Sequence, residues 1–363
     1  MRKDKINCLQ FAAMMSVILI ASFVGIGMFA IIKSAGVDAY LSIIIAGIIG
    51  IFIVLTFFVM FDYEPDLPIS LKFKKVFGPY LGTIFNVITM IIILSMGISA
   101  MFNLTTFITS QFLKNTPPLI VGLSFSFLII YVNFKGIETL SRTCLILLSI
   151  CITLYVISLF GLIPQFEMSN IKPFLEYGLE RPFVGAIYNL LFNLLPIYLL
   201  LVIPKNSIVN KEKYRKYIWF FYVLSIIIKL ALVLVTIGVL GIHLASIYQY
   251  PEYIVVKRAS LFNFIDRIEN IISIQWLFGL FFNISFVVYY ISNSIKTFNK
   301  SKFLPIIITT MILVGSELFF KNNTVFNDYT YTKVPYIRII LLIIYVLLFV
   351  GIIFKKKFSK KNN

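Results

Sequence analysis

Long apolar runs follow one another along almost the whole chain. Eight of them lack Asp, Glu, Lys and Arg, and each is long enough to cross a hydrocarbon core of ~30 Å as a helix. They cover residues 6–32, 39–61, 76–113, 115–134, 143–166, 182–204, 230–251 and 270–295. Two further helices are expected at about 303–320 and 336–354, and the seventh is expected to begin near Tyr217. The pattern predicts an all-α polytopic membrane protein with about ten transmembrane helices.

The composition favours a membrane protein over an enzyme or a nucleic-acid-binding protein. Of the 363 residues, 60% are hydrophobic and 13% charged, which is too little charge to cover a soluble protein of this size. The net charge of +17 comes from basic residues between the apolar runs. The sequence has no carboxylate pair, Ser–His–acid set, glycine-rich phosphate loop or metal-ligand spacing. We therefore expect no catalytic residue, metal, cofactor or nucleic-acid partner.

The basic residues are divided unequally between the two sides of the predicted membrane. With the amino terminus inside, 21 of the 32 Lys and Arg residues fall in the termini and the even-numbered loops, and ten fall outside. The remaining one is Lys229, within helix seven. Because cytoplasmic segments usually carry the excess of Lys and Arg, both termini are predicted to be cytoplasmic.

The ten predicted helices form two sets of five within a single transmembrane domain, residues 1–363. The first set covers about 8–163 and the second about 182–354, and a short basic cytoplasmic tail, 355–363, follows. Five is odd, so the second set must enter the membrane from the opposite face. Such an inverted repeat is typical of secondary transporters.

Helix-breaking residues occur at corresponding places in helices one and six. Two nearby glycines let helix one leave helical geometry at low steric cost, and a proline removes a donor from helix six. The candidate ligand-binding residues are Ser22, Val24, Gly25, Ile26 and Gly27 in helix one, and Asn189, Asn193 and Pro196 in helix six. Interrupted helices expose main-chain groups that bind ligands in transporters. The alternative is that these residues serve close packing and form no site.

A zwitterionic amino acid fits two such breaks. Freed N–H groups of helix one would face its carboxylate, and freed carbonyls together with Asn193 would take its ammonium. Ser95 and Ser99 in helix three and Asn283 in helix eight are candidate polar walls of the pocket. Single Ser or Asn residues in a bundle also commonly bond a neighbouring helix.

Lys229 lies near the centre of helix seven, where a charged side chain costs at least ~2.5–3.5 kcal/mol. One hypothesis is that its ammonium replaces the coupling cation of ion-driven relatives, as an ion-site substitute. The alternative is a long stem that reaches toward an interface or a water-filled crevice.

A series of short motifs occurs along the chain in the order of one known family. The motifs are Gln10 with Gly25 and Gly27, Asp38-Ala39-Tyr40-Leu41-Ser42, Thr116-Pro117-Pro118, Gly136 with Glu138 and Arg142, Asn170-Ile171-Lys172-Pro173, and Tyr250-Pro251 with Arg258, Arg267, Glu269 and Trp276. In these residues the chain resembles the spore germination permease family, the B subunit of germinant receptors, within the amino acid–polyamine–organocation transporter superfamily. The family's usual tryptophan is replaced by Tyr40, and no acidic residue precedes the proline of helix six.

This resemblance implies a membrane subunit of a nutrient germinant receptor that helps to trigger spore germination. Its small germinant, an amino acid by expectation, would bind at mid-membrane between discontinuous helices one and six. The resemblance also implies assembly with an A subunit and a lipoprotein C subunit in the spore inner membrane. Two alternatives stay open: a free-standing amino acid or polyamine transporter, and a structural subunit whose pocket is vestigial.

Overall fold

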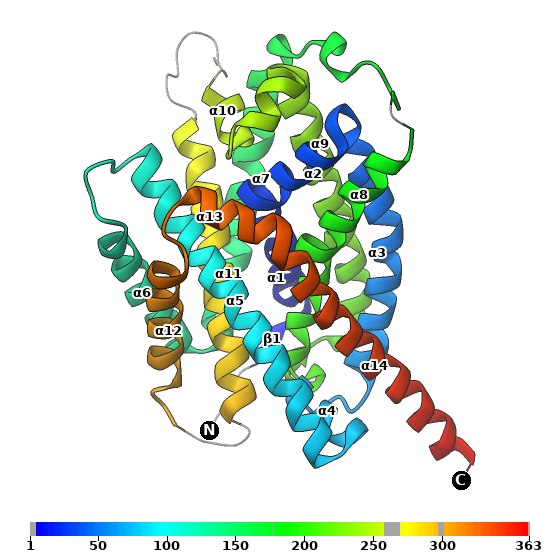
Figure 1. The fold of residues 1–363 in the computed structure, drawn as a ribbon. Coiled ribbons are helices and arrows are strands. Elements are labelled where there is room, and N and C mark those ends of the chain that lie inside the picture. The colour runs from blue at the N-terminus through cyan, green and yellow to red at the C-terminus, as the bar shows by residue number, and fades with distance from the viewer. Residues whose placement is uncertain (1–4, 177, 258–268, 297–300, 362–363) are drawn as a thin grey trace.

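The protein is an all-α bundle whose long helices run between two ends of the molecule (Figure 1). The computed structural model describes residues 5–176, 178–257, 269–296 and 301–361. Within these ranges, eight helical stretches are long and apolar enough to cross a membrane, and the shorter apolar helices Cys8–Ala21 and Leu304–Phe319 add two. The prediction of an all-α polytopic membrane protein is confirmed.

Helix one consists of three segments, and four long helices follow it. Helix one comprises α1 (Cys8–Ala21), the π turn η1 (Phe23–Gly27) and α2 (Met28–Ala35). After η2 (Gly36–Asp38), helices two to five are α3 (Ala39–Asp62), α5 (Pro79–Gln111), α6 (Pro118–Lys135) and α7 (Ile137–Leu162), with the short α4 (Ile69–Phe77) before α5. The 3-10 segments η3 (Ile163–Gln165) and η4 (Met168–Ile171) lead to the second half.

The second half again begins with a composite helix. Helix six comprises α8 (Glu180–Asn189), the π turn η5 (Leu190–Leu194) and the 3-10 segment η6 (Leu195–Val202). Then come η7 (Lys205–Ser207), η8 (Lys211–Lys213), α9 (Tyr214–Ile247), α10 (Pro251–Lys257), α11 (Glu269–Lys296) and α12 (Leu304–Phe319). The last helix comprises α13 (Asn323–Asp328), the π turn η9 (Tyr329–Lys333) and α14 (Val334–Lys361). The division into two inverted repeats stays a prediction.

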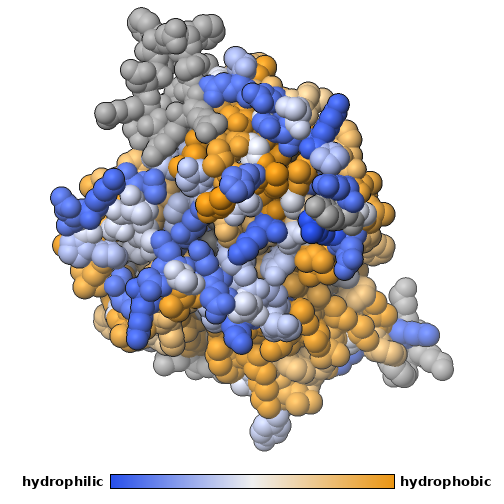
Figure 2. All heavy atoms as spheres, turned by 45° about the horizontal axis from the view of Figure 1, so that its top comes forward, coloured by the Kyte–Doolittle hydropathy of each residue, from blue (hydrophilic) through white to orange (hydrophobic). Residues whose placement is uncertain are grey.

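Large hydrophobic side chains cover the flanks of the bundle. Phe52 on α3, Phe127 on α6 and Leu318 on α12 are each 70–72% exposed. Hydrophilic residues gather instead on the end that faces the viewer in Figure 2, beside a hydrophobic flank. An apolar surface of this extent is suited to lipid and not to water.

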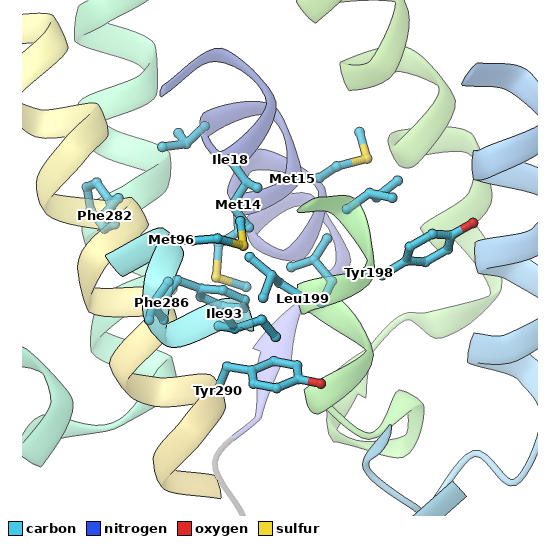
Figure 3. Close-up of a cluster of buried hydrophobic side chains, with 14 of the residues drawn as sticks. Met14, Met15, Ile18, Ile93, Met96, Tyr198, Leu199, Phe282, Phe286 and Tyr290 are labelled. Carbon is cyan, nitrogen blue, oxygen red and sulfur yellow. The ribbon is translucent and has the colours of Figure 1, made fainter. Parts of the chain in front are cut away.

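Helix one occupies the centre of the bundle. It contacts α7, α9 and α11, and Figure 3 shows its Met14 and Ile18 among side chains from α5, η6 and α11. Its start is fixed by a capping box, because the Asn7 side chain accepts from the Leu9 N–H while Gln10 Oε1 accepts from the Asn7 N–H at 3.0 Å. The first helix is thus held by packing along its length and by a cap at its start.

A short strand pair joins the start of helix one to the end of helix six. The strand β1 (Ile6–Asn7) runs directly into α1, and β2 (Ile208–Val209) follows η6 and η7. The two strands pair in parallel, with Ile6 opposite Ile208. This pair lies at the same end of the bundle as the C-terminal end of α14 (Figure 1).

The helix boundaries extend beyond several predicted limits. The fifth helix begins at Ile137 instead of 143 and the seventh at Tyr214, while the tenth begins at Asn323 instead of about 336. The predicted tail also continues α14 as helix through Lys361. Charge-free runs mark the hydrocarbon core alone, whereas helices extend further into the polar interface, where charged side chains are solvated.

Two of the sequence motifs hold the loop that joins the halves. Asp38 accepts from the backbone N–H of Leu175 at 3.0 Å, and the Asn170 side chain donates to the carbonyl of Gly238 at 2.9 Å. The chain of α9 bends just beyond this contact, at Gly241, whose φ of +71° favours glycine. These motif residues therefore maintain the fold and do not contribute to a pocket.

Lys72 of α4 is fully buried at the end of α3. Its Nζ donates to the carbonyls of Met60 (2.8 Å) and Phe61 (3.2 Å), which are among the last acceptors of that helix. Burial lowers the pKa of Lys72 to about 7.

Lys72→Met is expected to flatten the pH dependence of stability. Unfolded lysine titrates near its ordinary pKa of about 10.4, so between about pH 7 and pH 10 the unfolded chain binds the extra proton. The free energy of unfolding of the wild type should therefore rise with pH there, by up to about 1.4 kcal/mol per unit. Unfolding of the purified chain in detergent at several pH values measures this, with exposed Lys114→Met as the control. Equal slopes in the wild type and Lys72→Met would contradict it.

Candidate functional site

Helix one loses its α-helical hydrogen bonding midway, as predicted. The loss takes the form of one π turn, Phe23–Gly27, in which the backbone keeps right-handed helical angles; Gly27 has φ −68° and ψ −43°. A π turn widens the helix and is frequently found at functional sites. The break is therefore a local change of pitch and is less open than an unwound segment.

The main-chain carbonyl of Val24, in the π turn, is bound by a side chain from helix eight. Trp276 Nε1 donates to Val24 O at 2.9 Å. The Trp276 ring is held in turn by Phe107, with ring centroids 4.0 Å apart, and by Tyr250 at 5.1 Å. Two residues of the last sequence motif, Tyr250 and Trp276, thus stabilise the break in helix one.

Helix six changes geometry twice at the predicted place. It passes from α8 into the π turn Leu190–Leu194 and then into a 3-10 segment, which has Pro196 in its first turn. Asn193 Nδ2 donates to Asn189 Oδ1 at 2.9 Å, while Asn193 Oδ1 is buried with no hydrogen-bond partner in the described part of the chain. Proline at this point has no N–H to contribute, which favours the change of winding.

The two breaks touch each other at Gly27. A Cβ atom at this glycine would lie 2.7 Å from Asn193 Oδ1 and 2.9 Å from the carbonyl oxygen of Ser22. Only a residue without a side chain fits between these atoms, so the Asn193 side chain of helix six packs directly on the main chain of helix one.

A small cavity of about 40 Å³ lies beside the two breaks. It is enclosed by α1, α5, η5, α11 and the tenth helix, and its polar or aromatic lining includes Ser22, Ser99, Phe192, Asn283, Thr330 and Arg338. All three π turns in the described residues border it, because Ser22 directly precedes η1, Phe192 lies in η5 and Thr330 lies in η9. A space of this size holds a few water molecules, so a larger guest enters only when the surrounding helices move apart.

The cavity contains polar atoms that the protein leaves unpaired. Asn283 Nδ2 donates to Ser22 Oγ at 3.2 Å, but Asn283 Oδ1 and Thr330 Oγ1 have no partner among the described residues. The Arg338 side chain is 7% exposed, and its Nε and Nη1 are likewise unpaired. Buried donors and acceptors are nearly always satisfied, so these atoms indicate a site for a polar guest.

A wider hollow lies along α2 and α8, toward the end of the bundle away from β1 (Figure 1). It measures about 600 Å³ and is lined by Lys33, Glu180 and Arg181, among others. Tyr188 and Tyr331 also line it, and Tyr188 packs against Phe192 of the cavity with ring centroids 6.1 Å apart. Aromatic rings therefore separate this outer vestibule from the central cavity.

Toward the other end, the cavity is closed by packed hydrophobic side chains. Met96 lines the cavity and also belongs to the buried cluster in Figure 3, which includes Phe286 and Tyr290 of α11. Nearer that end, Asp62 at the end of α3 accepts from Lys205 Nζ (2.6 Å), from the Tyr214 hydroxyl (2.7 Å) and from Arg215. The structure is accordingly sealed on the side of the chain termini.

The predicted ligand-binding residues are spread over three environments. Ser22 lines the cavity, whereas Val24 lines a separate, largely apolar cavity between α1, α7, α9 and α11. Gly27, Asn189 and Asn193 meet where helices one and six cross, with Pro196 one turn further along helix six. Ser95 donates to Ile92 O of its own helix at 2.7 Å, and the neighbouring Ser99 lines the cavity instead. Gly25 and Ile26 lie in η1, but their surroundings are outside the described part of the structure. Arg258 and Arg267 lie outside the described residues.

Lys229 is buried beside the break in helix one. Its side chain is 1% exposed, and Nζ lies 5.6 Å from the centre of the Phe23 ring. Nζ has no hydrogen-bond partner among the residues that the structure describes. The lysine therefore does not reach an interface, and it faces the first residue of η1.

Sequence reasoning did not find Arg338. The predicted tenth helix began at about 336, which placed this arginine at the outer end of that helix. The observed helix begins at Asn323, so Arg338 is fifteen residues inside it. The available signal was an arginine at the start of a long charge-free run, 339–354, although only four residues separate it from Lys333.

Comparison with known proteins gives one family. The sequence model of a family described as "Spore germination protein" matches residues 5–325. Spore germination protein XB of Bacillus anthracis is 22% identical over 288 residues, which cover 78% of this chain and 80% of that protein. Spore germination protein A2 of Bacillus subtilis is 22% identical over 288 residues (78% and 76%), and spore germination protein KB of the same organism is 21% identical over 273 residues (74% and 72%).

Gly27→Ala is expected to disrupt the crossing of helices one and six without preventing synthesis of the chain. The added methyl group would force apart Asn193 and the Ser22 carbonyl, at a cost of about 1–3 kcal/mol. The unfolding midpoint of the purified chain measures the effect. In Gly47→Ala, the matched control, the three atoms nearest to the methyl group are side-chain carbons of Ile226, at 3.0 to 3.6 Å, so a small change is expected. Equal midpoints for the two variants would contradict a tight crossing at Gly27.

Proposed function

The chain belongs to the family of spore germination proteins, and on this basis we propose that it is the membrane subunit of a nutrient germinant receptor. In this role it binds a small germinant in the central cavity and helps to trigger spore germination. The observation that carries the proposal is the meeting of three π turns around one cavity with unpaired polar atoms.

The proposed ligand is a small amino acid. The cavity offers donors in Arg338 and acceptors in Asn283 and Thr330, which match the two charged ends of a zwitterion. Phe192, Met96 and Leu280 supply the apolar part of the lining. A pocket that is mainly apolar with a few polar groups is typical of a site that selects one small molecule.

Ligand binding acts by shifting the balance between two conformations of the bundle. The packed rings of Tyr188 and Phe192 lie between the cavity and the outer vestibule, whereas packed hydrophobic residues and the Asp62 network close the other side. A ligand can shift this balance only as far as its affinities for the two conformations differ. Helices one and six, which meet at Gly27, are the elements that would move.

The receptor is proposed to assemble with an A subunit and a lipoprotein C subunit in the spore inner membrane. Both termini would face the cytoplasm, since the end of the bundle where they lie carries Lys205, Arg215 and Lys355–Lys357. Named relatives that cover about three quarters of the chain are germination proteins, which supports an action in spores.

A free-standing amino acid or polyamine transporter is the second candidate. The vestibule, the aromatic partition and the closed inner side form the arrangement that alternating access requires. Uptake of labelled amino acids into liposomes that contain the purified chain would favour transport over sensing.

Deletion of the gene is expected to abolish germination with one group of amino acids and leave other nutrients effective. Germination is measured as the loss of optical density of a spore suspension for each nutrient in turn. Complementation with the wild-type gene should restore the response. A deletion strain that germinates normally with every nutrient tested would contradict the proposed function.

Lys229→Met tests the proposed role of the lysine as an ion-site substitute. If its ammonium replaces a coupling cation beside η1, the variant should respond to the germinant more weakly and with a changed pH dependence. Methionine fills a similar apolar volume without the charge. Unchanged dose and pH responses of spores carrying the variant would exclude this role.

A further inference from the structure

We infer that Arg338 is the anchor that binds the carboxylate of the ligand in the central cavity. This inference rests on the proposed function and gives the ligand class: a molecule with a free carboxylate, held by the tenth helix. It assigns the carboxylate to a side chain, whereas the sequence alone suggested main-chain N–H groups of helix one.

The burial of Arg338 without an anionic partner is the first argument. Its side chain is 7% exposed and lines the cavity, and no carboxylate lies within ion-pair distance of it in the described ranges. The ring of Phe192 approaches it, with the guanidinium carbon 5.9 Å from the ring centre, and Tyr329 lies nearby, but neither residue is a carboxylate. A buried charge without compensation is strongly destabilising, so the site is completed by an anion from outside the chain.

The unpaired donors of the guanidinium suit an anion. Its Nε and Nη1 are both unpaired, and their N–H groups point to different edges of the planar group. A carboxylate oxygen can accept a charge-assisted hydrogen bond from either of them.

The unpaired acceptors in the same cavity then take the other end of the ligand. Asn283 Oδ1 and Thr330 Oγ1 come from helix eight and from η9, and Ser22 Oγ completes this polar wall. An ammonium group would satisfy acceptors that have no donor among the residues that the structure describes. A polyamine, which carries only cationic groups, would instead place like charges beside Arg338, so the cavity favours amino acids over polyamines.

The approach to the cavity has a compatible charge. Lys33 and Arg181 line the outer vestibule beside one acidic residue, Glu180. Lys33 Nζ lies 5.9 Å from the centre of the Tyr331 ring, at the partition toward the cavity. A basic vestibule raises the local concentration of carboxylates at its mouth.

The ratio of acid to amide affinity tests the inference. The full chain is purified in detergent, and its unfolding midpoint is followed against the concentration of L-alanine, L-valine and L-leucine, and of their amides. The wild type should bind the acids more tightly than the amides. In Arg338→Gln, acid affinity should fall by roughly 10- to 100-fold with little change for the amides, because one charge-assisted contact is lost. Arg338→Lys should give an intermediate loss, since it keeps the charge without the fork.

Exposed Lys333→Gln, on the same helix, is the matched control and should bind like the wild type. An unchanged ratio of acid to amide affinity in Arg338→Gln would overturn the role of Arg338. The proposed function would still stand in that case if the acids bind and the deletion strain fails to germinate with them. Acetate, chloride and spermidine extend the panel. A rise of the unfolding midpoint with chloride or spermidine, but with no carboxylate, would also refute the inference. Germination of the deletion strain tests the receptor role independently. Should Arg338→Gln not fold, Arg338→Lys supplies the same ratio.

Discussion

The whole arrangement depends on the need to satisfy main-chain polar groups inside a membrane. A regular helix does so by itself, but a helix that changes pitch midway leaves groups that lipid cannot hydrogen-bond. Here side chains from elsewhere in the chain meet part of this need, as the Trp276 indole does for the carbonyl of Val24. Asn193 pairs with Asn189 beside the corresponding break in helix six. The breaks are therefore stable only within this bundle.

Some of the polar atoms that remain unpaired line the central cavity. Asn283, Thr330 and Arg338 each keep an unpaired polar atom there, whereas the hydrophobic cluster of Figure 3 closes the space below Met96. Unpaired groups in a low-dielectric interior reduce the stability of the empty protein. A ligand that pairs them recovers that free energy, which is a direct physical link between binding and conformation.

The sequence was sufficient for the ten-helix architecture and for the positions of both breaks, because apolar length and the Gly25, Gly27 and Pro196 signals are local. It could not give the form of the breaks, since π and α windings differ by hydrogen bonds that tertiary contacts select. Nor could it tell that Ser99 and not Ser95 lines the cavity, because the two serines share one face of α5, and the position of the cavity along that helix decides this. Arg338 was missed for another reason: a charged residue was taken to mark the end of a span, although the tenth helix starts well before it.

The parallel pairing of β1 with β2 limits how the bundle can change shape. One strand leads into helix one and the other follows helix six. The pairing of Ile6 with Ile208 therefore ties the start of helix one to the end of helix six. Ends fastened in this way cannot separate without breaking main-chain hydrogen bonds. Any widening around a ligand must then come from α2 and α8, the segments on the other side of the π turns. These two segments would pivot at the π turns while α1 and η6 stay together.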